Sequence, residues 1–226
     1  MTAVVSALYG ILGTSFIFLG FLCSMQTNRI DILASIVIGI IAGVLLALIG
    51  RNLPLPSGIM GLLKFLPLVF PLFTLGVMVI GTWLGHRVRI AYQLTKFVLV
   101  GGQNFLIDLG ILNLLIAASG VSEGFTASIW KALAFLVAVS SSFLWNKFWT
   151  FRSLSTAHAG VQFAEFLVVS GVGLAINVGV FALINDGLGP QGSASPEVWA
   201  SAAAVGAAIA GLMWNFLGYK FVVFRR

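Results

Sequence analysis

The stretch KFVLVGGQNFLIDLG at residues 96–110 returns in altered form as EFLVVSGVGLAINVG at residues 165–179, a shift of 69 (165 minus 96). A second stretch, SFLWNKFWTFR at residues 142–152, returns as NFLGYKFVVFR at residues 215–225, a shift of 73 (215 minus 142). Matched blocks in the same order indicate an internal duplication. We place the four extra residues of the second copy in its polar stretch 185–197. The sequence therefore predicts that residues 95–226 are two copies of one unit.

The chain is too apolar to stay soluble as a globule. Its 226 residues are 60% hydrophobic and only 8% charged, and the mean hydropathy is +1.10. A membrane-spanning helix needs roughly 20 apolar residues, and such segments lie at residues 3–23, 30–49, 65–84, 95–117, 127–149, 162–184 and 198–223. We expect an all-α integral membrane protein of about seven transmembrane helices, the last four forming two helical hairpins that repeat in parallel. The first segment could instead be a signal peptide, but no Lys or Arg precedes it.

Basic residues outnumber acidic ones, which gives a net charge of +6, and they are scattered over the ends of the predicted helices. This scatter argues against a nucleic-acid surface and reports membrane topology instead. With a cytoplasmic C-terminus the predicted cytoplasmic side carries Arg29, Arg87, Arg89, Lys96, Lys147, Arg152, Lys220, Arg225 and Arg226, and the opposite side carries Arg51, Lys64 and Lys131. The loop between Arg51 and Lys64 contains Pro54 and Pro56, which break a helix.

A basic stretch before residue 95 divides the chain into an N-terminal membrane extension, residues 1–94 with two to three helices, and the duplicated part, residues 95–226. In the extension, Gly39 and Gly43 form a small-xxx-small motif that predicts a helix contact. The last helix is rich in Ala and Gly, which predicts close packing within the bundle or between protomers. With one Cys and two distant His residues, we expect no metal and no cofactor.

Asp108 is the strongest single candidate for a functional residue, because an ionisable group deep in a membrane helix normally faces a bundle interior or a wet cavity. Gln103 and Asn104 precede it by about one turn, and Asn177 is its counterpart in the second copy. One hypothesis is a hydrophilic patch for a sugar or a proton. The other is a helix–helix hydrogen bond or an ion pair, for which Lys131 is a candidate partner. For Lys131 itself, the first interpretation is that its side chain extends to the membrane surface, and pairing with Asp108 is the alternative.

The two copies close with the same pattern of cations among aromatic residues. Lys147 and Arg152 return as Lys220 and Arg225. Such residues commonly anchor helix ends at the membrane surface. Their repeated order also suits a lipid phosphate, which Arg binds with a bidentate fork and Lys as a point charge. Glu165 is expected to pair with Arg152 or Lys96.

Two groups of residues resemble the GtrA-like family of small bacterial membrane proteins. The first is Lys96-Phe97-x-x-Val100-Gly101 with Asn104 and Asp108, and the second is Phe143-x-x-Asn146-Lys147-x-x-Thr150-Phe151. The resemblance covers residues 95–226 and implies a four-helix membrane domain linked to cell-surface polysaccharide synthesis. Its members are thought to move polyprenyl-phosphate-linked monosaccharides across the cytoplasmic membrane or to support the glycosyltransferases that use them. Tyr219 stands where the first copy has Asn146, a departure from the family pattern.

Together with the residues above, the resemblance implies a non-enzymatic flippase for a polyprenyl-phosphate-linked monosaccharide in the bacterial inner membrane. The alternatives are an accessory subunit of a membrane glycosyltransferase and a proton-coupled exporter in which Asp108 carries the proton. Expected partners are membrane lipid, the lipid-linked sugar, a glycosyltransferase and a second copy of the chain, but no nucleic acid. The expected substrate-binding residues are Gln103, Asn104, Asp108, Asn146, Lys147, Arg152, Asn177, Asn215, Tyr219, Lys220 and Arg225.

Overall fold

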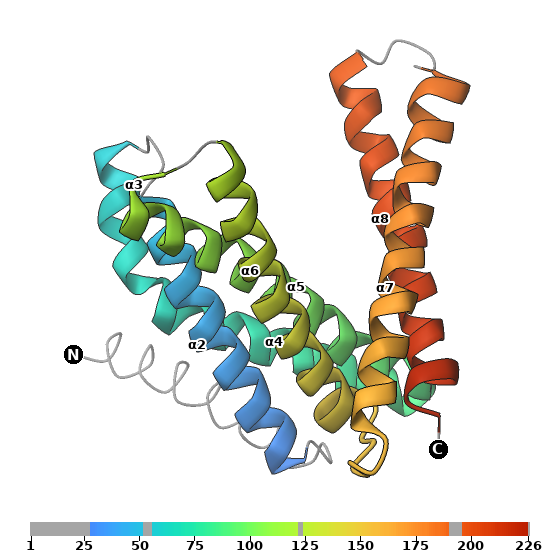
Figure 1. Ribbon diagram of the computed structural model, residues 1–226. Helices are drawn as coiled ribbons and strands as arrows, with labels where there is room; N and C mark the ends of the chain where they lie inside the picture. Colours follow the sequence, from blue (N-terminus) through green and yellow to red (C-terminus); the bar gives the residue numbers. More distant parts are fainter. Residues whose placement is uncertain (1–27, 52–55, 122–123, 190–195, 226) are drawn as a thin grey trace, which may run out of the picture. The chain divides into compact units, whose positions relative to one another are not determined.

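The computed structural model describes residues 28–51, 56–121, 124–189 and 196–225, and no strand occurs among them. Figure 1 shows its helices, which are α2 (Arg29–Arg51), α3 (Ser57–Leu62), α4 (Leu66–Arg87), α5 (Arg89–Ser119), α6 (Gly124–Trp145), α7 (Ala159–Ala182) and α8 (Pro196–Gly218). Within the described residues, six helical stretches are long and apolar enough to cross a membrane. The predicted all-α membrane fold is therefore confirmed, while the first expected segment, residues 3–23, lies outside the described residues.

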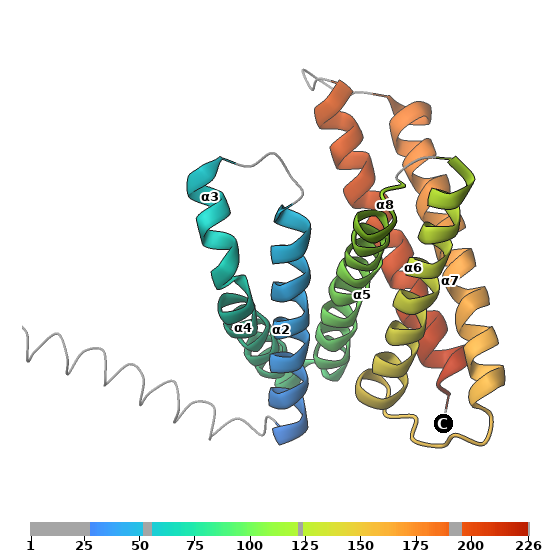
Figure 2. The same cartoon turned by 60° about the vertical axis from the view of Figure 1, so that its left-hand side comes forward.

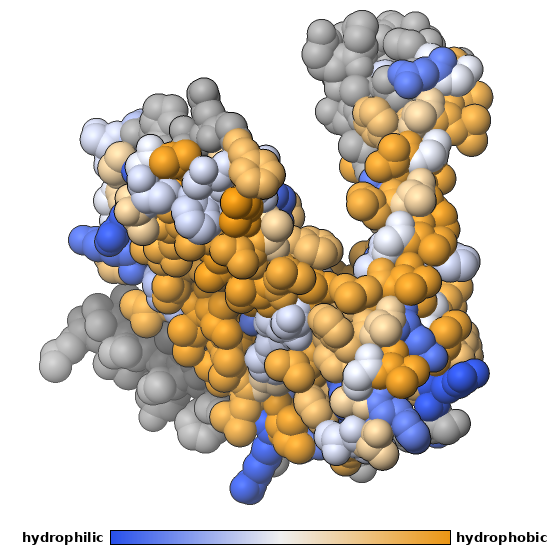
Figure 3. Space-filling view, in the orientation of Figure 1, coloured by the Kyte–Doolittle hydropathy of each residue, from blue (hydrophilic) through white to orange (hydrophobic). Residues whose placement is uncertain are grey.

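The surface agrees with a membrane location. On the face seen in Figure 3, hydrophobic residues cover most of the helices and hydrophilic residues gather mainly near helix ends. Large apolar side chains such as Leu68, Leu72 and Val168 are 70%, 70% and 66% exposed. In water such exposure would be costly, but hydrocarbon solvates these side chains.

Two helix boundaries differ from expectation. The segment after Pro56 is helical rather than a loop, and it runs through α3 into α4 as one apolar stretch, Ser57–Arg87. Pro56 is compatible with this start because it stands at the N-cap position, just before the first helical residue, where it interrupts no hydrogen bond of the helix. Helix α5 begins at Arg89, six residues before position 95 (95 minus 89), because the extended backbone at Val88 separates it from α4. Residues 89–95 contain no Gly or Pro to break the helix.

The chain forms two compact units, the first ending at Trp145 and the second running from Asn146 to Arg226. In the first unit, α2 packs on α4 and both contact α5, while α5 also packs on α6. Figure 2 shows α2 and α4 side by side. This division after Trp145 follows from which residues pack together, and it differs from the boundary that the sequence predicts. The sequence boundary near residue 94, which separates the duplicated part, stays a prediction.

The small-xxx-small motif lies at the contact between α2 and α4. A Cβ atom added at Gly39 would lie 2.4 Å from the Cα atom of Pro71, and one added at Gly43 would lie 2.4 Å from the carbonyl oxygen of Leu66. No larger side chain fits there without moving a backbone. The predicted helix contact is confirmed.

The second unit is built on the helical hairpin of α7 and α8. A Cβ atom added at Gly211 would lie 3.2 Å from the carbonyl oxygen of Gly173, and one at Gly218 would lie 2.5 Å from Val169 Cγ1. Nearby, the indole N–H of Trp214 donates to the carbonyl oxygen of Val169 at 3.1 Å. The small residues of the last helix thus serve close packing inside this unit.

Both closing helices end in a π-helical turn of five residues. These turns are Asn146–Thr150 and Tyr219–Val223, which are 73 residues apart (219 minus 146). In each, the N–H of the following Phe donates to a carbonyl five residues earlier, Phe151 to Asn146 and Phe224 to Tyr219, both at 2.8 Å. The shift equals that of the sequence signature, although the duplication itself stays a prediction. π-Helical turns are rare in proteins overall, but those that occur are often found at functional sites.

Candidate functional site

Asp108 forms an ion pair with Lys131, which links α5 to α6. The Lys131 ammonium donates to Oδ2 of Asp108. The Asp108 side chain is 19% exposed and that of Lys131 is 50% exposed. The structure therefore agrees with the hypothesis that Asp108 forms an ion pair with Lys131. Oδ1 of Asp108 and Oδ1 of Asn104, one turn earlier, are buried and have no hydrogen-bond partner among the described residues.

Gln103 lies on another side of the same helix. Five residues separate it from Asp108, which places the two side chains about 140° apart around the helix axis. Gln103 is only 2% exposed. Neither polar atom of its amide has a hydrogen-bond partner among the described residues. The expected polar stripe is therefore divided, with Gln103 pointing away from the ion pair.

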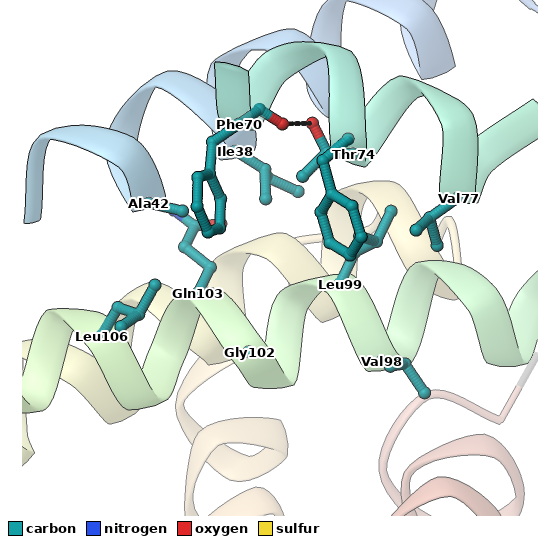
Figure 4. A pocket seen from close by; sticks show the side chains of 11 residues that line it. Ile38, Ala42, Phe70, Thr74, Val77, Val98, Leu99, Gly102, Gln103 and Leu106 are labelled. Carbon is teal, nitrogen blue, oxygen red and sulfur yellow. Dashed lines mark hydrogen bonds between the residues drawn. The ribbon is translucent and has the colours of Figure 1, made fainter. Parts of the chain in front are cut away.

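The Gln103 side chain lines a pocket of about 240 Å³ between α2, α4 and α5. Figure 4 shows the pocket, whose other walls are mainly aliphatic and phenyl side chains, among them Ile38, Phe70 and Leu99. The hydroxyl of Thr74 also lines it but donates to backbone carbonyls, 2.8 Å from that of Ser35. The pocket surface is therefore apolar, and the polar atoms of the Gln103 amide are buried rather than open to it.

A buried charge cluster joins α2 to α5. The Lys96 ammonium lies 2.6 Å from Oδ1 of Asp31, and the two side chains are 1% and 0% exposed. The Tyr92 hydroxyl donates to Oδ2 of the same carboxylate. Sequence reasoning placed Lys96 on the predicted cytoplasmic side and named it as one of two possible partners of Glu165. It did not identify Asp31 as the partner of Lys96. The available signal was a carboxylate near one end of a predicted span, opposite a cation in another.

Tyr92 also lines a second cavity, of about 310 Å³, at the corner between α4 and α5. The other lining residues are Thr82, Gly85, His86 and Arg89. His86 and Arg89 are exposed. We call this the basic cavity. Sequence reasoning used Arg89 only as a marker of topology.

In the second unit, Lys147 is held by protein groups. It is 1% exposed. Its ammonium donates to the carbonyl oxygen of Ser155 at 2.6 Å and to Oε1 of Gln162. Asn146, beside it, is also 1% exposed. A phosphate would have to displace these protein contacts to reach Lys147.

The remaining cations of the closing signature are more accessible. Arg152 and Arg225 are exposed, and Lys220 is half-buried. Lys220 lies over the rings of Phe216 and Phe221, 5.7 Å and 5.6 Å from their centroids. Arg152 has a φ of 52°, in the left-handed region that non-glycine residues seldom adopt.

The aromatic residues of the signature pack against one another. Phe151 and Phe224 stack with centroids 5.2 Å apart, and Tyr219 stacks on Phe166 at 4.2 Å. The Tyr219 hydroxyl also lies 2.6 Å from Oγ of Ser170. This packing gives the repeated order of aromatic residues a structural reason, independent of any ligand.

Two asparagines of the predicted site lie where α7 and α8 meet. A Cβ atom added at Gly173 would lie 2.1 Å from Oδ1 of Asn215, and one added at Gly211 would lie 3.3 Å from the Cβ of Asn177. Oδ1 of Asn215 is buried without a hydrogen-bond partner among the described residues. Each asparagine side chain therefore occupies space that a glycine in the opposite helix leaves free.

Comparison with protein families gave a match to a membrane domain family. The model of the family described as GtrA/DPMS, transmembrane domain, matches residues 96–224, more than half of the chain. No curated protein and no solved structure matches the chain.

Proposed function

Because the chain belongs to the GtrA/DPMS transmembrane domain family, we propose that it moves a polyprenyl-phosphate-linked monosaccharide across the membrane. The proposed location is the bacterial inner membrane with the C-terminus in the cytoplasm, and the product serves cell-surface polysaccharide or glycan modification. The observation that carries the proposal is the extent of the family match, which spans most of α5 and all of α6, α7, α8 and the final π-helical turn.

The structure is consistent with a carrier for a lipid head group. Only the sugar phosphate is polar, and the isoprenoid chain can remain in lipid, so a few polar atoms inside the bundle are sufficient. Among the described residues, buried amide or carboxylate oxygens without a hydrogen-bond partner occur at Asn104, Asp108 and Asn215. Each can accept a hydrogen bond from a sugar hydroxyl.

The test is transbilayer movement in liposomes. Purified protein is reconstituted with a fluorescent polyprenyl-phosphate sugar, and the fraction accessible to a membrane-impermeant quencher is followed over time. We expect faster exposure than in protein-free liposomes. Folded protein that leaves the rate unchanged would overturn the proposal, and co-purification with a stoichiometric glycosyltransferase would then favour the accessory role.

Asp108 needs a control because of its ion pair. Asp108→Asn removes the carboxylate but leaves the Lys131 ammonium without its partner. The double variant Asp108→Asn/Lys131→Gln removes both charges. If Asp108 acts on the substrate, both variants are slow, whereas a wild-type rate in the double variant assigns Asp108 a structural role.

A further inference from the structure

We propose that the lipid substrate binds along α4 and α5 of the first unit, with its phosphate in the basic cavity and part of its isoprenoid chain in the apolar pocket beside Gln103. The inference rests on the proposed function and locates its binding site. That site is formed partly by residues of the N-terminal extension, outside the family match.

The basic cavity presents groups suited to a phosphate. Arg89 offers a guanidinium fork and His86 an imidazole, and both are exposed. Neither forms an ion pair or a side-chain hydrogen bond with the described residues. Lys96 and Lys147, by contrast, are buried and bonded to protein oxygens. A bidentate arginine is the strongest of the common phosphate contacts.

The two cavities lie on one face of α5. Arg89 and Tyr92 line the basic cavity, and Leu99, Gln103 and Leu106 line the apolar pocket. Steps of three or four residues keep side chains on the same face of a helix. From Tyr92 to the pocket residues the rise is about 10 to 20 Å. This is the separation expected between a phosphate at the membrane surface and a chain in the hydrocarbon layer.

The walls of the pocket suit the chain of a lipid. Phe70, Phe73 and branched aliphatic side chains supply an irregular apolar surface. The polar atoms of the Gln103 amide are buried, so they present almost no polar surface to the chain. The match to an isoprenoid chain in particular rests on the proposed function.

Photocrosslinking tests the location of the site without requiring transport. A polyprenyl phosphate with a diazirine in its chain is added to the full-length protein in phosphatidylcholine nanodiscs, and labelled peptides are identified by mass spectrometry. We expect labels on α4 and α5 around Phe73 and Gln103. Labels confined to residues 146–225 would overturn the proposal.

Two neighbouring glycines provide matched variants. A Cβ atom added at Gly101 or at Gly102 meets no atom within 4 Å, so either position accepts a larger side chain. Only Gly102 lines the pocket. Gly102→Leu should abolish the pocket labels and Gly101→Leu should keep them. Equal labelling of the two variants contradicts the proposal.

The phosphate end is tested by binding affinity for the same probe. Arg89→Gln should weaken binding about tenfold, the usual order for loss of a charge-assisted contact. Arg87→Gln, an exposed cation that does not line the cavity, is the control and should bind like the wild type. Equal effects of the two variants would mean that Arg89 acts only by non-specific electrostatic attraction, and would overturn the assigned phosphate site.

Competition identifies the lipid. Unlabelled polyprenyl phosphate should displace the probe at lower concentration than phosphatidylglycerol or the uncharged polyprenol. Equal displacement by phosphatidylglycerol would make the site one for bulk anionic lipid and overturn the proposal. Labels at the site without transbilayer movement would instead refute the proposed function and leave the site in place.

Discussion

Removing the Asp31 charge should strongly destabilise the first unit, because Lys96 would remain buried without its counter-ion. The two atoms of the pair are 2.6 Å apart and the side chains are 0% and 1% exposed. Breaking such a pair from one side costs about 3–5 kcal/mol. We expect this loss for Asp31→Asn and a similar one for Lys96→Met, which leaves the Asp31 carboxylate buried without the ammonium.

The matched control removes both charges. In Asp31→Asn/Lys96→Met no charge remains buried, and the Tyr92 hydroxyl keeps a hydrogen-bond acceptor at residue 31. Replacing both members of a buried pair is often close to neutral. The double variant should therefore recover most of the loss seen in Asp31→Asn, and the two mutations should be strongly non-additive.

The measurement is the free energy of unfolding in mixed micelles, followed by tryptophan fluorescence as denaturing detergent is added. The reasoning is refuted if Asp31→Asn stays within about 0.5 kcal/mol of the wild type, the ordinary range for surface substitutions. It is also refuted if the double variant loses as much as Asp31→Asn and Lys96→Met added together.

Two other predictions concern helix packing and the apolar pocket. Gly43→Ala should lower the free energy of unfolding by about 1–3 kcal/mol, because the added Cβ would meet the α4 backbone. At Gly76 an added Cβ meets nothing within 4 Å, so Gly76→Ala should raise the free energy of unfolding by about 0.5–1 kcal/mol through helix propensity. Thermal unfolding of the two variants in detergent checks these opposite signs. Gln103→Met should be neutral or stabilising, since it replaces an amide that has no hydrogen-bond partner among the described residues by an apolar side chain of similar length. A clear loss of stability in the same assay would contradict that.

The spanning helices are predictable from sequence because hydropathy is a local property. Each of the six segments expected between residues 30 and 223 overlaps one of the described spans. The glycine motif at Gly39 and Gly43 also gave its helix contact correctly, since small side chains permit only a few arrangements of neighbouring helices.

The partners of the polar residues were less predictable. Asp31 and Lys96 are 65 residues apart in the chain, and only the packing of α2 on α5 brings them together. Gln103 and Asp108 are close in sequence but lie on different sides of α5. For Lys147, the partners come from the connection after its helix and from the next helix, Ser155 and Gln162.

The buried ion pair has a consequence for how the protein is assembled in its membrane. Asp31 is in the first turn of α2, and Lys96 is the eighth residue of α5, so both groups start near a helix end. During biosynthesis each can stay hydrated at the membrane surface until the helices meet. Because an unpaired charge is costly to bury, we expect both groups to lose their water only when the helices meet, so that the docking of α5 on α2 follows insertion. A chain lacking residues 1–94 would lack the Asp31 carboxylate, so the Lys96 ammonium would have to remain hydrated.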